Sequence, residues 1–358
     1  MIILKISVYA ISKNEEKFVR RWYESIKEAD DIYVLDTGST DETVKILKSL
    51  GVNVKVKKID PWRFDTARNL SLEMVPSDTD ICVCLDLDEV FEKGWRGKIE
   101  EVWKSDTTRL SYTYNWKLDG SRPVVSFYLD KIHKREGYRW KHPVHETLVY
   151  DKDEVRILNE NIIVNHYPDN NKSRASYLPL LELSVKEDPL DDRNMHYLGR
   201  EYMYYGRWNE SIDTLIKHLN LKSATWKDER CTSMRFIGRC YLKLNRLLES
   251  EMWYKKAIDE APYLKEPYAE LGLFYYNNKK YKKAKDLFLK ALNITRGYKS
   301  YITEYFTSDF YLFDLISICN YYLGEYKEAL NYCDKALKIK KDDRILKNKE
   351  LISVKFRN

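Results

Sequence analysis

The chain has 358 residues, which is long for one domain and sufficient for two that each bury a core. Its composition is 44% hydrophobic and 33% charged with only 12 Gly and 9 Pro, which excludes a disordered or fibrous protein. The net charge of +6 comes from 62 basic and 56 acidic residues that are interleaved along the chain, so a nucleic-acid binder is not indicated. We expect two folded, helix-rich domains.

The first residues, MIILKISVYAISKNEE, lack the basic segment and the long apolar core of a signal peptide. No stretch approaches the roughly 18 apolar residues that a membrane-spanning helix needs. The six cysteines are scattered, without the paired CxxC spacing of metal ligands. These features predict a soluble, cytoplasmic protein with reduced core thiols.

Short apolar runs alternate with helical patterns in the first half of the chain. The runs cover residues 2–11, 31–36, 52–56 and 80–86, and residues 14–29 between the first two place apolar side chains at helical spacing. This order predicts right-handed crossovers and a parallel sheet. In such sheets, ligands bind beyond the carboxyl ends of the strands.

A second helix is predicted between the runs at 31–36 and 52–56, in the sequence STDETVKILKSLG. Ser39 and Glu42 have the spacing of a capping box, and Gly51 follows the last turn. The sequence therefore predicts a helix that Ser39 caps at its N-terminus.

The second half of the chain contains an internal repeat. Four pairs of an apolar and a small residue recur, and nine residues after each small residue comes a large one. The small residues lie 39, 34 and 45 positions apart, and they would let paired helices pack closely. The pairs are Leu198-Gly199, Ile237-Gly238, Leu271-Gly272 and Ile316-Ser317, and the large residues are Trp208, Leu247, Tyr281 and Tyr326.

This pattern resembles the tetratricopeptide repeat, whose period is about 34 residues. The resemblance covers roughly residues 190–340, with two units lengthened by insertions. A generic helical bundle is the alternative. Either architecture predicts a helical second half that offers an interaction surface.

Acidic residues follow the last apolar run, in ICVCLDLDEVF at 81–91. Asp86 and Asp88 lie two apart, so in extended backbone both would face the ligand crevice, and Leu87 would point away. Carboxylates of this kind suit a hard divalent cation, Mg²⁺ or Mn²⁺, although a solvated acidic turn would give the same pattern. We expect Glu89 to be solvated or to lie behind the other two.

Three further segments accompany these acids. Asn14-Glu15 follows the first run, DTGSTD at 36–41 follows the second, and FDTARNLSLE at 64–73 precedes the acidic strand. In this order, over about residues 4–168, they resemble the family 2 glycosyltransferases of GT-A fold.

The resemblance implies an α/β GT-A domain, Rossmann-like with a mostly parallel sheet, at residues 1–170. A linking helix at 171–190 and an all-α tetratricopeptide-like repeat domain at 191–358 would follow. Pro179 lies inside the linking helix and suggests a kink or a break there.

The resemblance also implies roles for single residues. Glu15 and Asp36 would contact a uridine-type nucleoside, and Arg68 would approach the nucleotide or its phosphates. Asp86 would face the ribose or sugar and the metal, and Asp88 would be the principal ligand of Mn²⁺ or Mg²⁺. Simpler readings are a helix cap for residues 36–41 and a surface ion pair for Arg68.

Four of the six histidines fall between residues 133 and 166, and family members carry a similar VHE element and a later histidine. The resemblance therefore adds His145, Glu146 and His166 to the site. An inverting transfer needs a base to accept the acceptor's proton, and Glu146 is the candidate, with His145 beside it. His166 would complete the metal's coordination, with His145 as the competing assignment.

Three functions follow as hypotheses. The leading one is a metal-dependent, inverting transfer of a hexose from a nucleotide-sugar, UDP-linked by expectation, to an acceptor. The resemblance of residues 171–202 to the bacteriocin S-glycosyltransferases implies a peptide or protein acceptor presented by the repeats, and the sequence leaves a lipid or a glycan acceptor open as well. A peptide-binding scaffold with a catalytically silent GT-A domain is the alternative. A nucleotidyltransferase is a minor one, because no Gly-rich basic loop follows the first strand. The sugar and the oligomeric state stay open.

Overall fold

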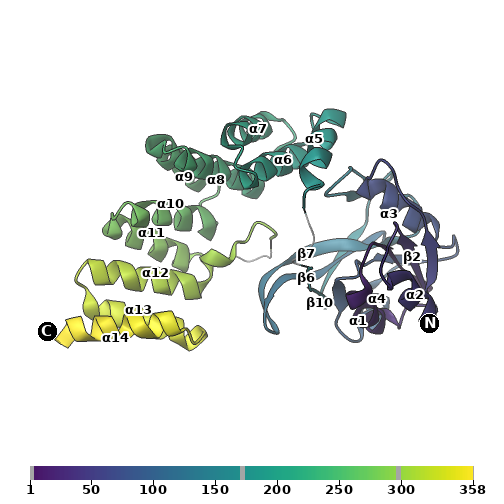
Figure 1. Cartoon of the computed structure of the whole chain (residues 1–358), viewed down its shortest axis with the longest axis horizontal. Helices are drawn as coiled ribbons and strands as arrows, with labels where there is room; N and C mark the ends of the chain where they lie inside the picture. Colours follow the sequence, from purple (N-terminus) through teal and green to yellow (C-terminus); the bar gives the residue numbers. More distant parts are fainter. Residues whose placement is uncertain (1–3, 170–173, 296–299, 358) are drawn as a thin grey trace. The chain divides into compact units, whose positions relative to one another are not determined.

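The computed structural model describes residues 4–169, 174–295 and 300–357 (Figure 1). The chain forms two compact units that divide between Glu187 and Asp188. The first unit is built on a mostly parallel sheet with flanking helices, and the second is a run of paired helices. The predicted fold classes of both halves are confirmed.

The sheet of the first unit has, within the described residues, eight strands in the order β3-β2-β1-β4-β7-β6-β10-β5. Strands β3, β2, β1 and β4 are mutually parallel, as predicted from the four apolar runs. Strand β7 runs antiparallel to β4 and β6, and β10 is parallel to β6. The strands are β1 Ile6–Ser12, β2 Asp31–Asp36, β3 Asn53–Val56, β4 Ile81–Cys84, β5 Glu89–Phe91, β6 Arg109–Asp119, β7 Arg122–Lys134 and β10 Arg156–His166, with β8 Tyr138–Lys141 and β9 Thr147–Tyr150 in a separate hairpin.

The central strands β1 and β4 are apolar on both faces because both faces are covered. Trp22 of α1 packs in the cluster on one face, and Trp140 packs with Tyr9 and the two β4 cysteines on the other. The six cysteines of the chain are all free and buried. The helices of this unit are α1 Glu16–Ile26, α2 Thr43–Ser49, α3 Phe64–Glu73, α4 Trp95–Val102 and α5 Tyr177–Glu187.

The capping box predicted for α2 is wrong. The helix begins at Thr43, and its first turn is bonded to Asp41, whose Oδ1 accepts from the Thr43 backbone N–H at 3.0 Å. The Ser39 hydroxyl donates instead to Oδ2 of Asp36, at 2.5 Å. The segment from 36 to 41 is therefore a loop that organises itself around Asp36, rather than the start of the helix.

Two helix ends were also predicted. Gly51 follows the last turn of α2 with φ of +79°, as expected of a glycine after a helix. Pro179 was expected to kink or break the linking helix, and this is wrong. It is the third residue of α5, in the first turn, where a backbone N–H has no intrahelical acceptor to lose.

The second unit consists of helix pairs that stack one after another along the chain (Figure 1). Each large residue of the predicted repeat, such as Trp208 or Leu247, is the first residue of the second helix in its pair. The pairs are α6 Asp192–Tyr204 with α7 Trp208–Asn220, α8 Lys227–Lys243 with α9 Leu247–Glu260, α10 Lys265–Asn277 with α11 Tyr281–Asn293, and α12 Asp309–Tyr322 with α13 Tyr326–Ile339, followed by α14 Asp343–Arg357.

The small residues of the repeat let the paired helices approach, as predicted. A Cβ built on Gly272 would lie 2.5 Å from Cε1 of Phe288, so only glycine fits there. The fourth pair uses a serine, Ser317, whose Oγ lies 3.0 Å from Sγ of Cys333. Each small residue contacts the side chain sixteen positions later: Gly199 with Leu215, Gly238 with Tyr254, Gly272 with Phe288 and Ser317 with Cys333.

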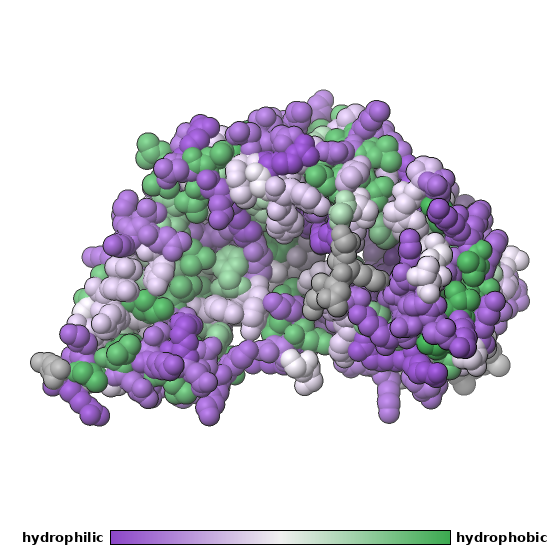
Figure 2. Space-filling view, in the orientation of Figure 1, coloured by the Kyte–Doolittle hydropathy of each residue, from purple (hydrophilic) through white to green (hydrophobic). Residues whose placement is uncertain are grey.

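The irregular spacing of the repeats arises from the linkers between pairs and from α8, which has 17 residues where α6 and α10 have 13. Residues 221–226 separate the first two pairs, and residues 294–308, which include the short helix η1 Tyr305–Thr307, separate the last two. Hydrophilic and hydrophobic side chains intermingle over the visible face (Figure 2). Among the helices described, none combines the length and the apolar character needed to span a bilayer.

Candidate active site

The acidic segment forms a turn just beyond strand β4. The strand ends at Cys84, and the backbone N–H of Glu89 donates to the Asp86 carbonyl at 2.9 Å, which closes the turn. Leu87 is buried in the core, as predicted. The side chains of Asp86 and Asp88 keep 27% and 23% of their surface exposed. Both carboxylates therefore stay accessible at the strand's carboxyl end, through a turn rather than extended backbone.

Arg68 holds Asp86 and Glu146 together. Its guanidinium binds Asp86 in a bidentate pair, with Nη2 at 2.9 Å from Oδ2, and its Nε donates to Oε1 of Glu146 at 2.9 Å. Burial opposes the charge of this arginine, but the Asp86 carboxylate, the neighbouring Cys84 sulfur and Glu146 raise its pKa well above the usual value. Arg68 is therefore a buried clamp, not the surface ion pair that was the simpler reading.

A second cation, Lys131 of β7, reaches the same carboxylate. Its Nζ lies 3.2 Å from Oδ2 of Asp86 and 2.9 Å from Oε1 of Glu89. Burial would raise the pKa of Asp86, and the charges of Arg68 and Lys131 hold it well below its usual range instead. Lys131 lies between Asp130 and Ile132 in β7, and no pattern in the sequence predicted its place in the site.

Glu89 is buried, so the expectation of a solvated acid is wrong. Its Oε2 accepts from the backbone N–H of Asp86 at 3.0 Å, and Lys131 neutralises it. Burial, reinforced by the charges of Asp86 and Asp88, raises the pKa of Glu89. Glu89 lies behind the two aspartates and fixes the turn that carries them.

Asp88 faces His166 at the end of β10. Its Oδ2 lies 3.5 Å from Nε2 of His166, and Nδ1 of that ring lies 3.2 Å from the carbonyl oxygen of Trp116. A carbonyl can only accept, so Nδ1 carries the proton and neutral His166 turns a lone pair on Nε2 toward Asp88. Burial lowers the pKa of His166, and Asp88 and Glu89 outweigh that effect and raise it.

This pairing fits a divalent cation. An imidazole lone pair and a carboxylate oxygen that face each other repel unless a proton or a cation lies between them, and both are metal ligands. A metal-binding histidine typically donates its other ring N–H to a backbone carbonyl or a carboxylate, as Nδ1 of His166 does here. Asp88 and His166 thus qualify as ligands, whereas both oxygens of Asp86 already bind cationic side chains.

The loops after β1 and β2 are bound to one another. Asp36 is fully buried, and its oxygens accept from the Ser12 hydroxyl at 2.8 Å, from the Ser39 hydroxyl, and from the backbone N–H groups of Gly38 and Ser39 at 3.0 and 2.8 Å. Gly38 has φ of +108°, which favours glycine. Asn14 joins the loops, since its Oδ1 accepts from Thr40 N–H at 2.8 Å.

Glu15 lies in the same place, at the start of α1. It is buried, and its backbone N–H donates to the Thr43 hydroxyl at 2.7 Å, so the first turns of α1 and α2 meet here. The structure thus brings Glu15 and Asp36 to neighbouring strand ends, as the order of the parallel strands requires. Their role toward a nucleoside stays a prediction.

The VHE segment forms a tight turn between β8 and β9. His142 and His145 have φ of +82° and +52°, in the left-handed region that few residues other than glycine adopt. Glu146 points to Arg68, and the His145 ring packs edge-on against Tyr177 of α5 at 5.7 Å between centroids. The described contacts bring His166, not His145, to Asp88.

The comparisons with known proteins match each unit to a family. Residues 7–162 match the family model of glycosyl transferase family 2, and residues 236–263, 266–298 and 315–343 match a tetratricopeptide repeat. The curated relatives include an uncharacterized glycosyltransferase of Rickettsia typhi, 24% identical over 71% of this chain and 76% of its own. The SPbeta prophage-derived glycosyltransferase SunS of Bacillus subtilis is 26% identical over 65% of this chain.

The alignment with SunS spans only 57% of that protein's length. Among solved structures, the crystal structure of MamA protein is similar at 21% identity and a TM-score of 0.35, over 45% of this chain and 79% of that one. The likeness to glycosyltransferases comes from the match over the sheet domain and from the curated relatives. Residues 7–162 thus form a domain that matches glycosyl transferase family 2, and the matches after it are to tetratricopeptide repeats.

Proposed function

We propose that this chain is a metal-dependent, inverting glycosyltransferase that moves a hexose from a UDP-sugar to a peptide or protein acceptor. The observation that carries the proposal is the arrangement beyond β4. Asp88 faces His166 at 3.5 Å, and Arg68 holds Asp86 and Glu146 beside them. In this proposal the metal ligands, the sugar-binding carboxylate and the candidate base gather near the end of β4, on the side where open α/β sheets bind ligands.

The loops after β1 and β2 would hold the nucleoside. Asp36 has its oxygens occupied by Ser12, Gly38 and Ser39, so it acts by fixing the shape of the loop. Glu15, at the start of α1, is the neighbouring acid. A loop whose shape is already fixed loses little conformational entropy when a nucleotide binds.

Asp88 and His166 would hold Mn²⁺ or Mg²⁺, with water and diphosphate oxygens completing the shell. The bound ion offsets the charge that develops on the leaving diphosphate. Asp86, fixed by Arg68 and Lys131 and still partly exposed, would accept a hydrogen bond from a hydroxyl of the ribose or the sugar. It is therefore a binding group rather than a second metal ligand.

Glu146 would take the acceptor's proton. Arg68 fixes one of its oxygens, Oε1, and the second can receive the proton as the acceptor attacks the anomeric carbon. The bond from the acceptor atom to the anomeric carbon forms as the bond to the diphosphate breaks, with inversion. The left-handed backbone of His145 sets the direction of this turn.

The test is release of UDP from a panel of UDP-sugars, with Mn²⁺, with Mg²⁺ and with chelator. Asp88→Asn should abolish metal-dependent turnover with little loss of stability. The matched control is Asp78→Asn, a surface aspartate that pairs with Lys5 and has 70% of its side chain exposed. Full activity of Asp88→Asn would refute the assigned role.

The alternative is a peptide-binding scaffold with a silent sheet domain. It predicts no binding of any nucleotide-sugar, with or without Mn²⁺, in a calorimetric titration of the intact chain. Binding without turnover would point instead to a missing acceptor, and peptide libraries would then be screened in the presence of the donor.

A further inference from the structure

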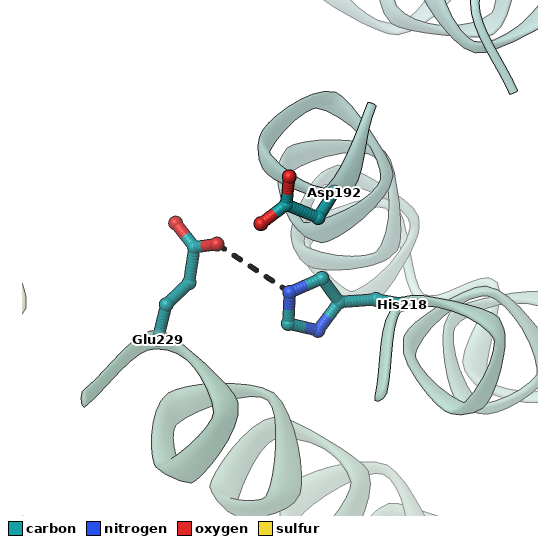
Figure 3. A group of neighbouring side chains, drawn as sticks. All are labelled: Asp192, His218 and Glu229. Carbon is teal, nitrogen blue, oxygen red and sulfur yellow. Dashed lines mark ion pairs between the residues drawn. The ribbon is translucent and has the colours of Figure 1, made fainter. Parts of the chain in front are cut away.

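A second cluster of ligand-type side chains lies in the repeat unit, and the glycosyltransferase chemistry does not use it. Asp192 begins α6, His218 lies in the last turn of α7, and Glu229 lies in the first turn of α8. One ligand atom from each lies within 4.8 Å of the other two, and all three side chains point toward a common centre (Figure 3).

His218 is oriented as a metal ligand would be. Its ring is fully buried, and Nδ1 lies 2.9 Å from the Ser233 hydroxyl. That hydroxyl also lies 2.7 Å from Nδ1 of His196, and it has one proton to give. When it donates to His196, it accepts from Nδ1–H of His218, and the lone pair on Nε2 then faces Glu229. When it donates to His218 instead, Nε2 carries the proton.

The Nε2 atom of His218 has no hydrogen-bond partner in the described part of the chain, and Oε1 of Glu229 lies 3.4 Å away. Two ligands at about 2.1 Å from a tetrahedral ion lie about 3.4 Å apart, which equals this separation. A buried lone pair that faces a carboxylate at this distance needs a cation between them, either a proton or a metal ion.

The Glu229 carboxylate is also held in place by a neighbouring side chain. It is buried, and the hydroxyl of Tyr301, from the linker before α12, donates to its Oε2. The nearby guanidinium of Arg193 is held over the Tyr197 ring at 5.2 Å. Asp192 and Glu229 together match the charge of one divalent ion.

We propose that Asp192, His218 and Glu229 bind a divalent transition-metal ion, Zn²⁺ by preference. One imidazole and two carboxylates are zinc ligands, and Asp192, the partly exposed member, closes the site from the solvent side with a modest shift of its side chain. Bound there, the ion would tie both helices of the first pair to the first helix of the second. Through Tyr301 it would also fix the linker that precedes the fourth pair.

The experiment uses the full chain, freed of metal with chelator, in the Asp88→Asn variant so that the sheet domain's own site is removed. Zn²⁺ is titrated by calorimetry, and thermal unfolding is followed with and without it. We expect one ion per chain and a higher Tm with Zn²⁺. Adding Glu229→Gln, which keeps an acceptor for Tyr301, should weaken binding at least about 100-fold and abolish the shift.

Asp192→Asn serves as a second variant, because this partly exposed residue at the start of α6 can change without disturbing the core. It should also weaken binding, while Asp213→Asn, an exposed aspartate of α7, should not. Absence of Zn²⁺ binding in the Asp88→Asn protein, or unchanged affinity in the Glu229 and Asp192 variants, would overturn the proposal and leave a protonated His218 paired with Glu229.

Discussion

The Arg68 guanidinium and the Asp86 carboxylate meet in a bidentate pair, Nη1 to Oδ1 and Nη2 to Oδ2, while Nε of the same arginine binds Glu146. A single buried cation thereby joins the acidic turn after β4 to the turn between β8 and β9. These segments are remote in the sequence, so the geometry of the site depends on α3, which carries the arginine.

Replacing Arg68 with Ala should leave Asp86 and Glu146 without their main counter-charge and destabilise the first unit by about 3–5 kcal/mol. Activity should be lost as well, because the carboxylates would move apart. Urea unfolding measures the first effect. The control is Arg139→Ala, whose partner Asp151 is exposed, and which should cost at most about 1 kcal/mol. An equal loss of unfolding free energy in the two variants would contradict the role of Arg68 as a buried clamp.

Trp116 stacks on the His166 ring, with 4.5 Å between centroids and 17° between planes, although 48% of its surface is exposed. Trp116→Ala should free the ring to rotate and raise the Mn²⁺ concentration for half-maximal UDP release by about 10-fold or more. The rate at saturating Mn²⁺ should change less. Trp116→Phe retains a stacking ring and should stay near wild type. If this Mn²⁺ concentration rose as much in the Phe variant as in the Ala variant, stacking would be excluded as the cause.

Gly272→Ala should destabilise the repeat unit by about 1–3 kcal/mol, because its Cβ would overlap the Phe288 ring. Helix propensity alone predicts the opposite, a gain of up to about 1 kcal/mol. Gly97→Ala in α4, where nothing lies within 4 Å of the added atom, isolates that gain. Gly272→Ala combined with Phe288→Leu should recover part of the loss, and thermal unfolding reports all three.

His133 should make the first unit acid-sensitive. Its Nδ1 donates to the Lys134 carbonyl and its Nε2 accepts from the Tyr9 hydroxyl, at 2.7 and 2.8 Å, and burial lowers its pKa from 6.5 to about 3. The unfolded chain therefore binds the proton first. The contribution of neutral His133 to the unfolding free energy is fully present above pH 6.5. It falls as the pH drops toward 3, by about 1.4 kcal/mol per pH unit.

The check is the difference in unfolding free energy between wild type and His133→Gln, followed from pH 7 to pH 4. Other groups titrate equally in both proteins, so the wild type should lose its advantage as the pH falls. A difference independent of pH would show that His133 has the same pKa in the folded protein as in the unfolded chain.

Cutting the chain after Leu190 should leave UDP release intact and weaken transfer to a peptide acceptor. The cut keeps α5, whose Glu187 binds Arg63 at the start of α3, close to Arg68. If the shortened chain transferred sugar to the peptide at the wild-type rate, the repeats would play no part in acceptor binding. Loss of UDP release as well would show that the sheet domain depends on them.

Much of this architecture follows from periodicity. The four parallel strands and the helix pairs were predicted, because alternation and the recurring small residues are local signals. The site was predicted only in part. Lys131 comes from an antiparallel strand whose register no local pattern specifies. Ser39 and Glu42 have the spacing of a capping box, but the Ser39 hydroxyl donates to Asp36 instead.

The sixteen-residue interval between each small residue and its contact is the same in all four pairs, although the pairs themselves start 39, 34 and 45 residues apart. The extra residues lie in α8, which has 17 residues against 13 in α6 and α10, and in the linkers. The linker before α12, with the segment that carries Tyr301, is thus a place where the chain accommodates added sequence without altering the sixteen-residue interval of any pair. Surface for a new partner can be added there while the packing of each pair is left unchanged.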